Sequence, residues 1–167
     1  DKAPCLTLAP SAPHIHNILE DIYIEARMCT SHPGTFRRGI ELNNLRMCEQ
    51  MPSIQSQIEK KYSDFAIMAN LLLQYCRAGT INNLSGYKGP YLDYLEDCMP
   101  YVDVAIYSDE TKDRFHASNH IVAILWEYIK PLIEETKERM EQDSASDASQ
   151  MLVELLGNQI HGATPLP

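Results

Sequence analysis

Five cysteines carry the strongest chemical signal in this chain of 167 residues, and all of them lie in its first 98 residues. They are Cys5, Cys29, Cys48, Cys76 and Cys98. Their spacing is wide and irregular and includes no Cys-x-x-Cys pair, so it does not match a zinc module. We expect either disulfides between separate elements or a set of buried thiols. The spacing does not assign a pairing, and two disulfides would leave one thiol free.

None of these cysteines has the surroundings of a catalytic nucleophile. Cys98 follows Glu96 and Asp97, and such acidic neighbours would raise the pKa of a thiol rather than lower it. The chain also lacks a Gly-x-Ser-x-Gly motif, a P-loop and a dinucleotide-binding fingerprint. We therefore predict that the protein is not an enzyme and uses no cofactor.

A second group of ligand-forming side chains falls on one stripe of an expected helix: Asp113, His116, His120 and Glu127. The spacings Asp-x-x-His and His-x-x-x-His can present two ligands to one metal ion. A carboxylate-bridged metal pair needs a second such motif on a facing helix, and the sequence has none. The pattern favours a solvated or interface face without metal. An intracellular helical metal-binding protein or enzyme that uses His116 and His120 stays open as an alternative.

Tyrosine is the most informative aromatic residue, with nine tyrosines against three phenylalanines and one tryptophan. Tyrosine joins a large apolar ring to a polar tip, which suits protein interfaces, and partly buried packing is the competing interpretation. Five tyrosines gather around one loop and the segment after it: Tyr87, Tyr91, Tyr94, Tyr101 and Tyr107. Our candidate binding residues are Tyr87, Tyr91 and Tyr94, with Glu127, Lys130 and Glu134 on the outer face of a long helix.

Apolar residues at three- and four-residue steps predict the helices that position these groups. The first runs from Pro13 to the stop at His32-Pro33-Gly34. Residues 35–50 fit either a helix or a long loop with a short helix, because Gly39 weakens the helical pattern. A buried central helix is expected from Pro52 to a stop at Gly79, and a polar loop over residues 80–89.

The second half of the chain predicts three more helices. Residues 90–107 favour a helix kinked at Pro100, although residues 101–107 have a strand-like composition. The longest helix follows a cap at Ser108 or Asp109 and should kink at Pro131. A last helix would turn Leu152, Leu155, Leu156 and Ile160 inward. We expect a single helical domain over residues 1–167, with a flexible start at 1–12, a linker at 142–150 and a tail at 162–167.

Net charge and local motifs indicate which partners and which compartment to expect for the protein. A net charge of −9 disfavours binding to nucleic acid. The longest apolar run is Ile121 to Trp126, far short of the roughly 20 residues that span a bilayer, so we expect no membrane insertion. The opening residues are typical of a mature secreted chain, and Asn83-Leu84-Ser85 fits the N-glycosylation pattern. These features predict a secreted, extracellular protein.

The predicted fold class is all-α, a four-helix bundle with long connections and one or two extra short helices. Four main helices, long connections, possible disulfides and a glycosylation triplet resemble the general plan of secreted helical cytokines and growth factors. The resemblance implies a signalling ligand that binds a cell-surface receptor through exposed helix faces. A secreted or host-directed effector or inhibitor that binds a partner protein is the alternative. The sequence does not indicate an oligomeric state.

Overall fold

The computed structural model describes residues 11–142, and within them it forms seven helices and no strand. The all-α prediction is confirmed. The helices are α2 (Ser11–Ser31), α3 (Thr35–Gln50), α4 (Ile54–Glu59), α5 (Asp64–Ala78), α6 (Pro90–Tyr107), α7 (Thr111–Ile124) and α8 (Trp126–Gln142). The predicted last helix with Leu152, the tail at 162–167 and Cys5 lie outside the described residues, as do most of the predicted flexible start at 1–12 and of the linker at 142–150.

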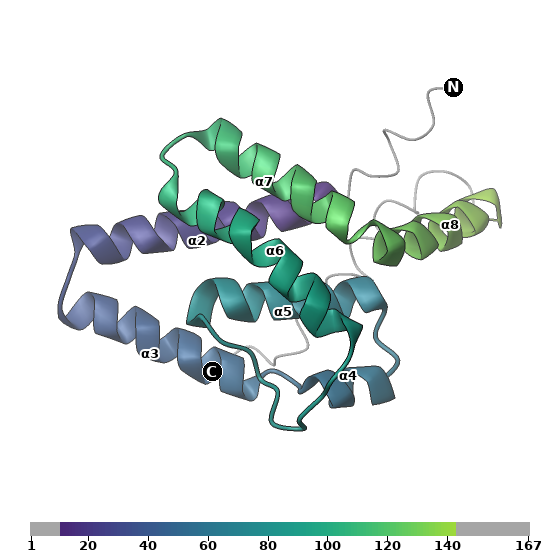
Figure 1. Ribbon diagram of the computed structural model, residues 1–167, viewed down its shortest axis with the longest axis horizontal. Coiled ribbons are helices and arrows are strands. Elements are labelled where there is room, and N and C mark those ends of the chain that lie inside the picture. The colour runs from purple at the N-terminus through teal and green to yellow at the C-terminus, as the bar shows by residue number, and fades with distance from the viewer. Residues whose placement is uncertain (1–10, 143–167) are drawn as a thin grey trace.

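The helices are arranged around α5, which lies in the middle of the molecule (Figure 1). It packs against α2, α3, α4, α6 and the start of α8. Helix α6 crosses α5 and also contacts α2, while α7 packs on both α2 and α6. Helices α2, α5, α6 and α7 therefore enclose most of the core, and α8 extends away from them (Figure 1).

Helix α5 is the buried central helix that the sequence predicts. The Ser63 hydroxyl caps its start by accepting from the Ala66 N–H at 3.2 Å, and Gly79 ends it in the left-handed conformation at a φ of 66°. Its polar residues have interior partners, since Asn70 Nδ2 donates to Gln57 Oε1 at 2.9 Å. Gln74 Oε1 accepts from the Asn82 N–H at 2.6 Å. These bonds hold α4 and the loop after α5 against the central helix.

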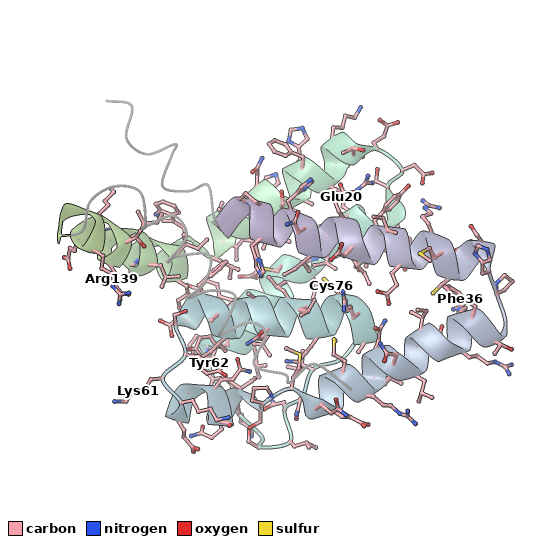
Figure 2. All side chains as sticks on the ribbon, turned by 180° about the vertical axis from the view of Figure 1, so that it is seen from behind. Glu20, Phe36, Lys61, Tyr62, Cys76 and Arg139 are labelled. Carbon is pink, nitrogen blue, oxygen red and sulfur yellow. The ribbon has the colours of Figure 1, made fainter. Side chains whose placement is uncertain are left out.

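One helix was expected from Pro52 to Gly79, and the structure corrects this to two. The helix is interrupted between α4 and α5, where Lys61, labelled in Figure 2, takes a left-handed φ of 58°. Ser53 caps α4 by accepting from the Ser56 N–H at 3.3 Å, and Ser63 caps α5 in the same way. A periodic apolar stripe survives such a break, because both short helices turn their apolar residues to the same core.

The predicted longest helix is also two helices, and its break lies at Leu125 rather than at Pro131. Pro131 sits inside α8. The ring of a proline inside a helix clashes with the carbonyl group four residues earlier, which for Pro131 is that of Glu127. Pro131 therefore distorts the helical turn that precedes it. On α7, Phe115 is 54% exposed, whereas Arg114 beside it is buried.

The ambiguous segment 35–50 is helical throughout as α3. Its Asn44 is buried and donates through Nδ2 to a Glu25 carboxylate oxygen on α2 and to the Arg77 carbonyl oxygen on α5. These tertiary contacts offset the weak helical propensity of Gly39. The segment 90–107 is likewise one helix, with Pro100 exposed on its outer side, so the helical interpretation is confirmed over the strand.

A buried arginine joins α7 to α2. Arg114 is 3% exposed, and its Nε donates to Glu20 Oε1 at 2.7 Å across 94 positions of sequence. Its other nitrogens donate to the Ser108 carbonyl oxygen and the Thr111 hydroxyl, both at 3.1 Å. The guanidinium lies 3.8 Å above the centre of the Tyr23 ring. Figure 2 labels Glu20, the α2 residue of this ion pair.

Candidate functional site

Three of the predicted binding residues belong to a tyrosine cluster where α6 meets the start of α8. Tyr91 and Tyr94 are one turn apart on α6, and Tyr87 precedes the helix in the loop. Asn83 fixes that loop: its Oδ1 accepts from the Tyr87 N–H at 2.9 Å, and its Nδ2 donates to the Tyr87 carbonyl oxygen at 3.1 Å. The loop therefore places the Tyr87 ring against that of Tyr91, and Tyr94 follows one turn further along α6.

A fourth ring, that of Tyr128 on α8, completes the cluster. The centroids of Tyr87 and Tyr91 are 5.6 Å apart, and their ring planes are inclined at 29°. The Tyr128 centroid lies 5.7 Å from that of Tyr91 and 4.8 Å from that of Tyr94. These separations are those of interacting aromatic pairs. We define the tyrosine cluster as Tyr87, Tyr91, Tyr94 and Tyr128.

Two carboxylates accept the hydroxyl groups of the cluster. Tyr91 Oη donates to Asp64 Oδ1 at 2.5 Å, and Tyr94 Oη donates to Glu127 Oε2 at 2.8 Å. Burial, followed by the bond to Asp64, raises the pKa of Tyr91, and the bond to Glu127 raises the pKa of Tyr94. Burial raises the pKa of Tyr128 to about 12. These three phenols stay neutral at physiological pH, which suits hydrogen bonding and ring stacking rather than base catalysis.

The other predicted binding residues continue from the cluster along α8. Glu127, Lys130 and Glu134 are exposed and recur at three- and four-residue steps, so they share one side of the helix. Lys130 Nζ lies 3.9 Å from Glu134 Oε1. The structure thus brings Glu127 together with the three predicted tyrosines, and it places Lys130 and Glu134 further along the same side of α8. The sequence analysis did not include Asp64 or Tyr128 among the candidates. Asp64 could have been found as the first residue of α5, and Tyr128 as the residue that follows the candidate Glu127.

The cysteines form no disulfide within residues 11–142. Cys48, Cys76 and Cys98 are buried free thiols, and Cys29 is a half-buried one. Of the two expectations for these four cysteines, the disulfides are therefore absent. The alternative, buried thiols, holds for Cys48, Cys76 and Cys98. Burial raises the pKa of Cys76 and of Cys98 to about 12, which keeps both protonated and unreactive.

The histidines of the alternative metal site lie exposed on α7. The His120 ring stacks on Tyr101 with centroids 4.7 Å apart, and His116 contacts the edge of Phe115. Among the residues that the structure describes, no three histidine, cysteine, aspartate or glutamate side chains are placed to hold one metal ion. The two histidines therefore make aromatic contacts on the surface of α7.

The proposed glycosylation residue, Asn83, is half-buried, and both ends of its amide bond the backbone of Tyr87. It thus has a structural role in positioning the tyrosine cluster, and its glycosylation stays a prediction. No helix within residues 11–142 has the length and apolar character needed to cross a bilayer. Comparison with known proteins gives no match to a family model, a curated protein or a solved structure.

Proposed function

We propose that the protein is a helical signalling ligand and that the tyrosine cluster, with Glu127, is its contact for a cell-surface receptor. The observation that supports this is the joining of four tyrosine rings with the carboxylates of Asp64 and Glu127 at one edge of the core. Tyrosine is enriched at interface centres because its ring gives a large contact area at low entropic cost.

The arrangement also supports a receptor surface with basic residues. A tyrosine face attracts an arginine or lysine cation, and Glu127 and Asp64 are ready acceptors beside it. Trp126, 40% exposed at the start of α8, adds a further aromatic side chain next to Glu127 in sequence. In this proposal α2, α5, α6 and α7, which pack on one another, are the four main helices of a cytokine-like bundle.

The proposal is tested with an array of receptor ectodomains. Wild-type protein and a Tyr94→Ala/Glu127→Ala variant are screened in parallel, with Phe115→Ala on α7 as an exposed aromatic control. We expect at least one ectodomain that binds the wild type and the Phe115→Ala variant and loses its signal with the double variant. A screen in which no ectodomain distinguishes the double variant from the control contradicts the proposal.

A second candidate is an effector or inhibitor that binds its partner in a reducing compartment. The four free thiols among the described residues favour it, because secreted domains normally oxidise their cysteines in pairs. Alkylation of protein from its native source separates the two candidates. Labelling of Cys29, Cys48, Cys76 and Cys98 in denaturant without reduction agrees with the free thiols and supports the effector. Protection of two pairs until reduction would contradict the free thiols and support the secreted ligand.

A further inference from the structure

A surface hollow of about 400 Å³ lies between α5, the loop that follows it and α6. Its apolar walls come from α5, the following loop and α6: Tyr75, Ile81, Leu92, Leu95 and Met99. None of these residues belongs to the tyrosine cluster, so the hollow is a separate feature. Its volume falls in the range of sites that take a ligand or an anchoring side chain.

Two carboxylates accompany this hollow. Glu96 lines it directly, and Asp103 lies two helical turns further along α6. Asp103 is seven residues after Glu96, so both lie on the same side of α6. Burial, followed by the charge of Asp103, raises the pKa of Tyr75 in the wall of the hollow. Among the described residues, neither Glu96 nor Asp103 forms an ion pair. Tyr107, one turn after Asp103, is 79% exposed.

We propose that this hollow binds a basic amphipathic segment of a partner protein, with an apolar side chain between Leu92 and Met99 and a lysine or arginine at Glu96 and Asp103. We choose this occupant because of charge complementarity. An apolar surface next to two carboxylates that have no cationic partner favours binding of a segment that combines apolar and cationic residues. The net charge of −9 would also draw such a segment toward the protein.

This surface does not depend on the proposed receptor contact. The hollow and the tyrosine cluster share no residue, so two partners, or two parts of one partner, can be bound at once. An anionic membrane or a nucleic acid is the wrong occupant, since Glu96 and Asp103 would repel its phosphates.

The test uses a fluorescein-labelled amphipathic helix built only of leucine and lysine, titrated with full-length protein at low salt and followed by anisotropy. A matched peptide with glutamate in place of lysine is the peptide control. The variant Glu96→Gln/Asp103→Asn removes the carboxylate that lines the hollow and the one two turns further along the same side of α6. Asp93→Asn/Asp97→Asn removes the same charge from other exposed positions of α6 and is its matched control.

We expect the Glu96→Gln/Asp103→Asn variant to weaken binding about tenfold and the control variant by no more than about twofold, because Glu96 lines the hollow and Asp103 lies on the same side of α6, whereas Asp93 and Asp97 do not line it. Met99→Gln should weaken binding, whereas Leu45→Gln, in the neighbouring hollow on α3, should not. Equal losses in the two charge variants, insensitivity to Met99→Gln, or no binding of the leucine–lysine helix overturns the proposal. The Tyr94→Ala/Glu127→Ala variant should bind the peptide normally, which keeps this test independent of the receptor contact.

Discussion

Replacing Arg114 by methionine should destabilise the fold strongly, although the sequence marks this position as an ordinary polar residue of a helix. Only 4% of the Arg114 side chain is exposed, and it makes hydrogen bonds to Glu20, Ser108 and Thr111. Methionine keeps the apolar stem of the side chain but loses all three bonds and the stacking on Tyr23. It also leaves the Glu20 carboxylate without its cation.

The loss can be estimated from these contacts. Removing one partner of a buried ion pair costs about 3–5 kcal/mol. Glu20 keeps access to water, because 26% of its side chain is exposed, so the lower end of that range applies. We expect a loss of about 3 kcal/mol, which corresponds to a fall in Tm on the order of 10 °C for a chain of this size.

Arg27→Met is the matched control. Arg27 also lies over the Tyr23 ring, at 5.1 Å, and also pairs with a carboxylate, that of Asp109. Its side chain is 44% exposed and that of Asp109 is 75% exposed, so losing this pair should cost less than about 1 kcal/mol. Urea unfolding followed by circular dichroism measures both variants. Equal losses in the two, or a loss at Arg114 below about 1 kcal/mol, would refute the burial argument.

Three further predictions concern the backbone, the tyrosines and the thiols. Gly79→Ala should lower the free energy of unfolding by about 1 kcal/mol and Lys61→Gly should raise it slightly, because both positions have left-handed φ angles; opposite signs in urea unfolding would contradict this. Burial raises the pKa of Tyr91 and Tyr128 above the ordinary value of about 10, so the stability that this gives below pH 10 should be lost as pH rises toward about 12, and a flat alkaline profile of the unfolding free energy would contradict it. Native alkylation with mass spectrometry should label Cys29 before the three buried thiols, which should react only on unfolding; protection of Cys29 until reduction would contradict the free-thiol assignment.

The helix ends that local chemistry controls were predictable from the sequence. Pro90 starts α6 and Gly79 ends α5 where expected, because proline and glycine constrain their own backbone. The break before α5 was missed, since an apolar stripe continues through it and only the Ser63 cap marks it. The full length of α3 depends on Asn44 reaching α2 and α5, a tertiary contact that propensity does not contain.

In the site too, residues that are close in sequence could be predicted, whereas contacts between residues far apart in sequence could not. Tyr91 and Tyr94 could be chosen because they are close in sequence and share a helix. Tyr128 joins them only because the first turn of α8 brings its ring against those of Tyr91 and Tyr94, and no periodic pattern in the sequence predicts that contact. Arg114 is the clearest case, since its burial depends on Glu20 at a distance of 94 positions along the chain.

The central claim is that the tyrosine cluster with Glu127 is a protein-binding surface. The most direct measurement is the affinity of wild type, Tyr94→Ala, Glu127→Ala and the double variant for one receptor ectodomain, by surface plasmon resonance. Because central interface residues cost about 2 kcal/mol or more when truncated, each single variant should weaken binding about thirtyfold. The double variant should lose less than the product, since the two side chains share a hydrogen bond. Affinities within about threefold of the wild type for all three variants would contradict the claim.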